Sequence, residues 1–360
     1  MKKLYTRQKF KLRQQRHFRR TKKQRWRRKL SGYNHSNIPY LISNGEKKYN
    51  AIQYHQDAHQ VKPKVVAPTD FRLLSNTEEC VSFFHDLRSE HCRYLQRGRP
   101  TVTIDLSFVE QMDYSTISIM TSINEDFKAK GILLRGNYPI NEECKQFFID
   151  SGFLNNMYDE RGRKFPTSEM SESLFFQKGA KRLERKDNIR LSNVVKNIVK
   201  HLTNESNHWP KLREMLLEIC GNSLEWSKAE NKQWLFGVMY EKDRVIVTVT
   251  DVGLGILKTL HRNHTNKFLE EIRLKKRHKV LMGAFEGKYT SKSKKSNRNL
   301  GLPSIKANFE SKRIKELKVL TNNVILHFDN TSESGTINGG GCWFKGTFYR
   351  WIITKECLNT

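Results

Sequence analysis

Residues Arg244-Val-Ile-Val-Thr-Val-Thr-Asp-Val-Gly-Leu-Gly-Ile256 begin with valines at every second position. This alternation is typical of a β-strand with one face buried. The strand runs directly into Asp251, which is followed by Gly253 and Gly255. Two glycines separated by one residue allow the backbone to turn tightly and to lie close to a ligand. Because Gln233 to Val238 alternates in the same way, the two segments predict a hairpin that ends in a glycine-rich turn.

A predicted helix precedes this hairpin. Apolar residues recur at three- and four-residue steps over 211–228, and Glu218 and Asn222 lie one turn apart on the same side. An Asn oxygen suits Mg²⁺, which prefers oxygen ligands and keeps several waters. A Glu carboxylate can take a proton from a water molecule. The same spacing also fits an exposed helical Glu beside a capping or core Asn, so the pair alone leaves both interpretations open.

Further polar and glycine-containing blocks follow the hairpin. Asp251 at the strand end can accept a hydrogen bond from an exocyclic amine such as that of adenine, although an ordinary turn has a similar composition. Residues 257–299 are polar and basic, which predicts a flexible flap. The segment 299–305, Asn-Leu-Gly-Leu-Pro-Ser-Ile, starts a predicted helix, and amides at a helix start attract phosphates. The last predicted strand begins with Gly346 and Thr347.

In this order and at these distances, the blocks resemble the GHKL ATPase superfamily. That superfamily includes gyrase-type ATPases, heat-shock chaperones, mismatch-repair ATPases, histidine kinases and anti-sigma-factor kinases. The resemblance covers roughly residues 190–356. It implies a Bergerat-type α/β sandwich over residues 165–360, with ATP and Mg²⁺ as cofactors.

The resemblance also implies a role for each matching residue. Glu218 would be the catalytic base that activates water, and Asn222 would be the magnesium ligand. The other positions implied at the nucleotide are Asp251 at the adenine amino group, Gly253 and Gly255 on the pocket floor, Asn299, Leu300, Gly301 and Leu302 at the lid and phosphates, and Gly346 and Thr347, where Thr347 supports the base through a water.

Two positions depart from the family pattern. Glu225 is followed by Trp226, where the family often has His. Asn299 stands where a glycine is common before Leu300 and Gly301. The second change predicts slower lid closure or weaker phosphate contacts. Adenine binding is therefore better supported than rapid hydrolysis.

Residues 46–164 predict a smaller α/β domain in which strands alternate with helices. Strands are expected at 65–68, 71–74, 101–106 and 132–134, and helices at 76–96, 115–130 and 141–150. The segments 104–116, 129–134 and 151–154 resemble a STAS domain, the fold of bacterial anti-anti-sigma factors. A further helical pattern at 165–205 leads into the second domain.

In the STAS family, a turn before a helix presents a phosphoacceptor serine. Ser115 falls nearest to that position, but Tyr114 replaces the usual small residue. Asp113 and Ser115 also make a good helix cap, because a side-chain oxygen can accept a hydrogen bond from an unpaired amide. Capping is the favoured interpretation.

Charge is concentrated at the N-terminus. The net charge is +29, and residues 1–30 hold 15 Lys or Arg and no Asp or Glu, while the remainder carries +14. Residues 1–45 therefore predict a flexible basic arm. Its cations and interleaved aromatic residues suit nucleic-acid phosphates and bases. A solubilising tail without a specific partner has the same composition.

Cysteine usage and hydropathy indicate the cellular compartment. The six cysteines include no Cys-x-x-Cys pair, which gives little support to a zinc site and fits reduced thiols in a cytosol. No apolar run approaches the roughly 18 residues of a membrane span, and no apolar segment follows the basic N-terminus as in a secretory signal. We therefore expect a cytoplasmic chain without a membrane partner.

Three functions follow from these observations. The leading hypothesis is an ATP- and Mg²⁺-binding switch with slow hydrolysis, which couples nucleotide state to a protein partner or a second copy, with nucleic acid contacted through residues 1–30. An alternative is a serine/threonine protein kinase of the anti-sigma type. The third is a nucleic-acid-binding scaffold with a degenerate nucleotide pocket.

Overall fold

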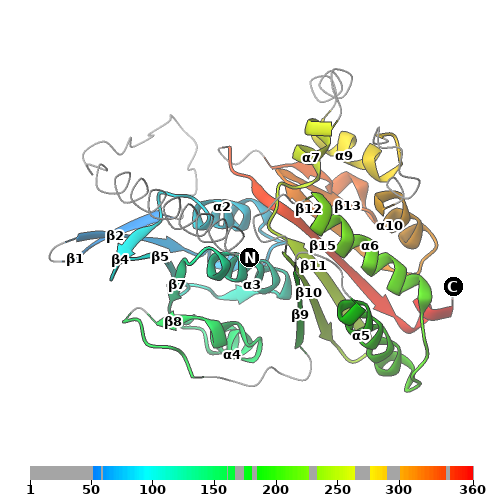
Figure 1. Ribbon diagram of the computed structural model, residues 1–360, viewed down its shortest axis with the longest axis horizontal. Helices are drawn as coiled ribbons and strands as arrows, with labels where there is room; N and C mark the ends of the chain where they lie inside the picture. Colours follow the sequence, from blue (N-terminus) through cyan, green and yellow to red (C-terminus); the bar gives the residue numbers. More distant parts are fainter. Residues whose placement is uncertain are drawn as a thin grey trace, which may run out of the picture. The chain divides into compact units, whose positions relative to one another are not determined.

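The computed structural model describes residues 52–57, 60–159, 161–166, 174–180, 185–226, 233–263, 276–289, 301–337 and 341–359. The predicted basic arm, Asn299 and Leu300 lie outside these residues, as does the side chain of Asn222. Lys48–Thr360 form one compact unit of mixed α/β structure (Figure 1). The predicted α/β class is thereby confirmed.

The first sheet is mixed. Its strands are β1 (Ile52–Asp57), β2 (Gln60–Val66), β4 (Tyr94–Gln96), β5 (Arg99–Asp105), β7 (Leu133–Gly136) and β8 (Tyr158–Asp159). Within the described residues they run in the order β1-β2-β5-β7-β8, and β4 pairs with β5. The central pairings are parallel, whereas β1 and β4 add antiparallel edges. Two short strands, β3 (Asp70–Phe71) and β6 (Gln111–Met112), form a separate parallel pair.

Three helices accompany this sheet: α2 (Thr77–Leu87), α3 (Tyr114–Ala129) and α4 (Glu142–Asp150), followed by a 3-10 turn at Phe153–Asn156. The expected helices at 115–130 and 141–150 are confirmed. Asp113 caps α3 by accepting a hydrogen bond from the Thr116 amide at 2.8 Å, and Asn141 caps α4 through the Cys144 amide at 3.0 Å. These caps satisfy amides that have no partner within the helix.

The helix expected at 76–96 is wrong in its second half. It ends at Leu87, and β4 and β5 then form an antiparallel hairpin. Arg97 and Gly98 between the strands have φ angles of +47° and +75°. Two successive residues with positive φ are what a tight hairpin turn requires, and glycine adopts such angles without strain.

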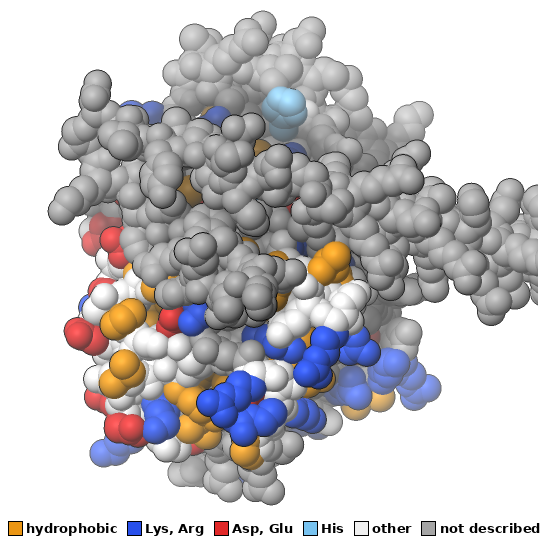
Figure 2. Space-filling view, turned by 90° about the vertical axis from the view of Figure 1, so that its left-hand side faces the viewer, with side chains coloured by type: hydrophobic (Ala, Val, Ile, Leu, Met, Phe, Trp, Pro, Cys, Tyr) orange, Lys and Arg blue, Asp and Glu red, His pale blue; other side chains and the backbone are white. Residues whose placement is uncertain are grey.

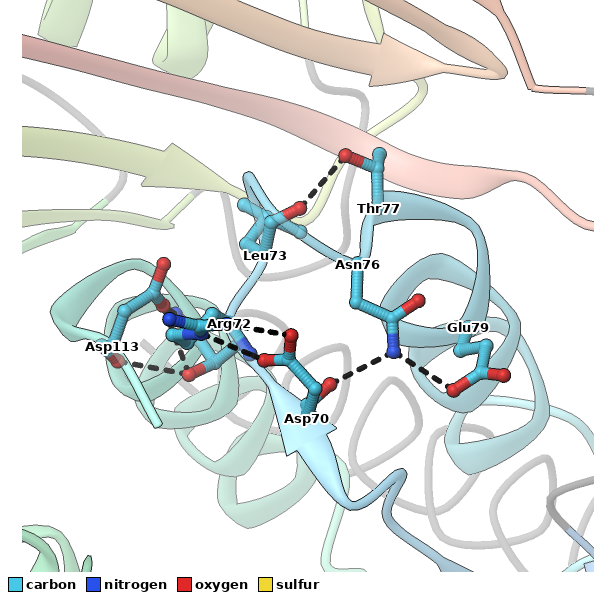
Figure 3. A network of polar contacts seen from close by, with 8 residues as sticks. Asp70, Arg72, Leu73, Asn76, Thr77, Glu79 and Asp113 are labelled. Carbon is cyan, nitrogen blue, oxygen red and sulfur yellow. Dashed lines mark hydrogen bonds and ion pairs between the residues drawn. The ribbon is translucent and has the colours of Figure 1, made fainter. Parts of the chain in front are cut away.

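A polar network holds the start of α2 against the start of α3 (Figure 3). The Arg72 side chain pairs with the Asp70 carboxylate at 2.8 Å, and Asn76 donates to the Asp70 carbonyl at 2.9 Å. The Leu73 amide donates to the Asp113 carboxylate, which is also the cap of α3. The two helices are therefore tied together at their N-terminal ends.

The second sheet is antiparallel in every described pairing. Its strands run in the order β14-β13-β12-β15-β11-β10-β9. Their bounds are β9 (Leu174–Ala180), β10 (Gln233–Tyr240), β11 (Arg244–Asp251), β12 (Lys315–Asn322), β13 (Val324–His327), β14 (Gly335–Thr336) and β15 (Phe344–Thr354). The expected hairpin of β10 and β11 is confirmed, whereas β9 was not expected from the sequence.

The helices of this half are α5 (Arg185–Thr203), α6 (Pro210–Trp226), α7 (Ile256–Asn263), α9 (Arg277–Phe285) and α10 (Gly301–Glu310), with 3-10 turns at Thr331–Glu333 and Lys355–Asn359. The expectation of a flexible flap over 257–299 is wrong for α7 and α9. Val280, Leu281 and Phe285 of α9 are buried in the core. The rest of that segment lies largely outside the described residues.

The two faces of the second sheet have different covers. On β11, Val245, Val247 and Val249 point into one core. This core is completed by apolar side chains of α5, α6, α9 and α10, including Leu191, Val195, Leu216, Ile219, Val280, Phe285 and Ile305. The helices therefore form a layer on this face (Figure 1).

The opposite face is covered by the first half of the chain. Tyr114 on α3 donates its hydroxyl to the Val238 carbonyl at 3.0 Å. Ser118 lies 3.0 Å from the Thr248 hydroxyl and 3.1 Å from that of Thr250. Because α2 also contacts β2 and β15, and α3 also contacts β7, these two helices lie between the two sheets.

Surface charge is unevenly spread. Figure 2 shows Asp and Glu side chains gathered at the left margin of one face and Lys and Arg side chains toward its lower right. Within the described residues, no helix is both long and apolar enough to cross a membrane. None of the six cysteines, all of which are described, takes part in a disulfide.

Candidate functional site

Asp251, the last residue of β11, is a buried carboxylate with well-defined partners. One oxygen accepts a hydrogen bond from the Gly253 amide at 2.8 Å. Thr347, directly opposite on β15, contributes hydrogen bonds from its side chain and its backbone. An ionised carboxylate has about four acceptor positions. Among the residues that the structure describes, these three donors leave room for one more.

Burial raises the pKa of Asp251 to about 6, while its hydrogen bonds and the charge of Arg88 oppose that rise. The carboxylate is therefore mostly ionised at neutral pH, although it is buried. Keeping a charge in such a place is costly unless it has partners. Carboxylates with shifted pKa values occur often at functional sites.

Two of the predicted glycines are required by packing. A Cβ atom added at Gly346 would lie 2.1 Å from the Asp251 carbonyl oxygen. At Gly255, which has a φ of +82°, a Cβ atom would lie 2.6 Å from the Asn322 side chain. The space beside both glycines is filled by the protein itself. Close approach of a ligand to these positions stays a prediction.

The end of β12 adds two residues that the sequence reasoning missed. Thr321 donates to the Gly346 carbonyl at 2.9 Å and accepts from the Ile256 amide at 2.9 Å. Asn322 donates to the Leu254 carbonyl at 2.8 Å. Together they hold the glycine-rich turn after Asp251 against the start of β15. In the sequence, a Thr-Asn pair at a strand end indicates only a turn. The hydrogen-bond partners of these two residues could not be predicted, because they depend on which strands lie next to β12.

Glu218 on α6 and Asp251 on β11 face the same core region. Tyr349 on β15 is buried between the sheet and the helices, and its pKa is raised by burial, then by the negative charges of Asp251 and Glu218. Both carboxylates therefore lie within electrostatic range of one phenol. Glu218 itself is half-buried.

The other predicted residues are partly described. Gly301 is the first residue of α10 and is buried, and Leu302 is half-buried against the same core. The helix α10, which begins at Gly301, packs on α6, the helix that carries Glu218. Asn222 follows one turn later on α6, but its side chain, like all of Asn299 and Leu300, lies outside the described residues.

No group of three or more His, Cys, Asp or Glu residues within the described part is arranged to hold a metal ion. A magnesium ion held by the single oxygen of Asn222 would need no such group, because Mg²⁺ keeps several waters and takes oxygens from bound phosphates.

Ser115 lies in the first turn of α3 and is only 2% exposed. A hydroxyl buried in this way is out of reach of another protein's active site. The capping interpretation is confirmed for Asp113. Phosphorylation of Ser115 stays a prediction that would require α3 to move.

No protein-family model matches this chain, and no curated protein matches it either. The resemblance to GHKL and STAS proteins therefore stays a hypothesis, which depends on the residues described above.

Proposed function

We propose that the chain is an ATP- and Mg²⁺-binding switch that hydrolyses ATP slowly. Residues 165–360 would form a GHKL-type domain with the Bergerat sandwich. The layer of helices on one face of an antiparallel sheet supports this reading. Residues 46–164, with helices and a mixed sheet whose central pairings are parallel, would be the STAS-like domain.

The observation that carries the proposal is the buried carboxylate of Asp251. Gly253 and Thr347 fix its orientation and leave one acceptor position. The exocyclic amine of adenine is a neutral donor of the right kind for that position. Among the described charges at this strand end, Arg88 is the one that a buried carboxylate could pair with, but Arg88 already has Asp126 as an ion-pair partner. Pairing with Arg88 therefore does not by itself explain why Asp251 is a buried carboxylate.

The phosphates would lie toward α6 and the start of α10. Amides at the N-terminus of α10 attract phosphate groups. Magnesium held by Asn222 would neutralise part of the phosphate charge. Glu218, one turn earlier on α6, would accept the proton of the attacking water.

Nucleotide binding would be transmitted through the helix layer. Nucleotide bound at the start of α10 would change how α10 packs on α6, and that surface would then meet a protein partner or a second copy. Hydrolysis through Glu218 would reset the packing. The departure at Asn299 from the family's glycine makes slow turnover the expected outcome.

The first test compares Glu218→Ala and Asn222→Ala with wild type in ATP binding and turnover. We expect Glu218→Ala to retain nucleotide and to lose at least 100-fold in turnover, since proton transfer by a positioned base contributes about 10²–10⁴-fold. Asn222→Ala should lose magnesium-dependent binding. Glu214→Ala is the matched control, because Glu214 lies one turn before Glu218 on the same helix and is exposed. Wild-type turnover in both site variants would contradict the assignment.

The alternatives give different results in the same preparation. With ATP labelled at the terminal phosphate, label on protein would support the kinase, and free phosphate alone would support the switch. Salt-sensitive nucleic-acid binding that is lost with residues 1–30 and unaffected by ATP would support the scaffold.

A further inference from the structure

Arg88, the residue that caps the C-terminus of α2, reaches from the first half of the chain into the second sheet. Its guanidinium donates to the Val252 carbonyl at 2.8 Å and also to the Lys345 carbonyl. Val252 directly follows Asp251, and Lys345 directly precedes Gly346. One side chain therefore joins the two chain segments that meet at the candidate site.

The environment of Arg88 is unfavourable for a cation. Its side chain is only 9% exposed, and its ion-pair partner Asp126 on α3 lies 3.9 Å away and also pairs with Lys130. Burial lowers the pKa of Lys345, and so does the positive charge of Arg88, Lys258, Arg93 and Lys130. Several cations thus crowd one place. A buried arginine among other cations is a poor way to gain stability, since desolvation of a charge is costly.

We propose that Arg88 is a positioning residue of the nucleotide site, which holds the Asp251 and Gly346 segments together where the two strands end. The inference rests on the proposed function. It assigns the first half of the chain a direct part in building the pocket of the second half.

The charge argument depends on which groups face Asp251. From β15, Thr347 donates hydrogen bonds and the buried phenol of Tyr349 lies nearby. Glu218 on α6 acts on the same phenol. From α2 comes Arg88, whose positive charge lowers the pKa of Asp251. Without it, the pKa of Asp251 would rise above about 6 and toward neutral pH.

A protonated carboxyl group has lost acceptor capacity, since one oxygen now carries a hydrogen. The amine of adenine would then have no acceptor at the strand end. Loss of Arg88 should therefore weaken nucleotide binding and move its pH dependence, beyond any general loosening of the fold.

The experiment measures ATP affinity of the full chain between about pH 5 and 8, a range that spans the titration of Asp251. Arg88→Met removes the charge and both hydrogen bonds at similar volume. Arg88→Lys keeps the charge but not the planar fork that reaches two carbonyls. Arg72→Met is the matched control, because Arg72 pairs with Asp70 just before α2 begins (Figure 3), whereas Arg88 caps the other end of that helix.

We expect Arg88→Met to bind ATP roughly tenfold more weakly at pH 7, mainly because the hydrogen bonds that hold the Asp251 and Gly346 segments together are lost, and we expect the midpoint of its pH profile to move to higher pH. Arg88→Lys should keep the wild-type midpoint while losing affinity, and Arg72→Met should match wild type. If Arg88→Met does not fold, the affinity of Arg88→Lys decides: weaker ATP binding would support the proposal, and wild-type affinity would contradict it.

Three results would overturn the proposal. An Arg88→Met profile equal to that of wild type would remove Arg88 from the site and leave the proposed function intact. The same loss in Arg72→Met would show a general structural effect. Failure of wild type itself to bind ATP at any pH would end the proposed function, and the role of Arg88 with it.

Discussion

At the scale of single residues, stability and the proposed function oppose each other at Asp251. The pKa of this carboxyl is about 6 in the folded chain, against an ordinary value of 3.8. The folded state therefore holds its proton more tightly than the unfolded state does. Stability from this group is fully present below about pH 4 and is lost as pH rises through about 6. A group that only served the fold would not carry this penalty at neutral pH.

The substitution Asp251→Asn tests this opposition. The amide is similar in shape and cannot ionise, so the penalty disappears, although the amide offers fewer acceptor positions. We expect the free energy of unfolding at pH 7 to be unchanged or to rise, by up to about 3 kcal/mol from the two-unit difference in pKa. ATP binding should be lost.

Denaturant titrations at several pH values would measure the effect. The stability of Asp251→Asn should change less than that of wild type between about pH 4 and 7. A variant that is much less stable at pH 7, or that still binds ATP as wild type does, would contradict this account of Asp251.

At the scale of elements, the site depends on how β11 and β15 end together. Asp251 pairs with Thr347 in the register of the two strands. The next residue on β15, Gly346, lies so close to the Asp251 carbonyl that no side chain fits. The close backbone contact at Gly346 therefore depends on the register of β11 and β15. A substitution at Gly346 would move Asp251 and Thr347 out of alignment.

Gly346→Ala should lower the free energy of unfolding by about 2 kcal/mol or more, because a Cβ atom at 2.1 Å from an oxygen forces the strands apart. It should also abolish ATP binding, since Asp251 and Thr347 lose alignment. Gly335→Ala is the control, because a Cβ atom there has no neighbour within 4 Å. Equal thermal denaturation midpoints for the two variants would disagree with this reading.

Much of the element order is visible in the sequence. Helices α3, α4 and α6 and strands β10, β11 and β15 follow their apolar periods, because each has one face in a core. The misses have local causes. α9 begins with basic residues that hide its buried Val280, Leu281 and Phe285. The helix expected over 76–96 misses the hairpin of β4 and β5, whose only signal is the tight turn at Arg97 and Gly98.

The residues of the candidate site divide in the same way, into those that the sequence predicts and those that only the fold brings together. Its named blocks carry short-range signals: a strand that ends in an Asp-x-Gly-x-Gly turn, and a Gly-Thr pair at the start of another. Thr321, Asn322 and Arg88 carry no such signal, because what they do depends on partners far away in the chain. Only the folded arrangement brings α2 to the end of β11.

At the scale of the whole molecule, the central fact is the shared layer of α2 and α3 within the unit Lys48–Thr360. Phe84 of α2 lies edge-on to Phe344 of β15, with ring centroids 6.4 Å apart. Val252, Phe344 and Phe348 of the second half belong to the core cluster formed by the first half. A chain cut between the halves would expose this apolar surface to water.

The positive net charge of the chain also favours an anionic partner. The remainder of the chain beyond residue 30 carries +14, and Figure 2 shows that most acidic side chains on one face lie at its left margin, with Lys and Arg side chains over its lower part. An anionic partner would be drawn to the basic part, and that attraction would weaken with added salt.

The shared layer predicts that both halves unfold together. Cys80 and Cys92 are buried in the first half, and Cys220 and Cys357 in the second, so their rates of reaction with a thiol reagent report opening of each half separately. Ile119→Val on α3 should lower the free energy of unfolding by about 1 kcal/mol. Because the core around α3 is shared, we expect all four thiols to become more reactive by the same factor. In a denaturant titration, the tryptophan fluorescence of residues 48–360 should change in the same unfolding transition as the first half of the chain. Every tryptophan in this range lies at or beyond Trp209, so this signal reports the second half. If Cys80 and Cys92 gain reactivity while Cys220 and Cys357 keep theirs, the halves open independently, and α2 cannot hold the nucleotide site in place.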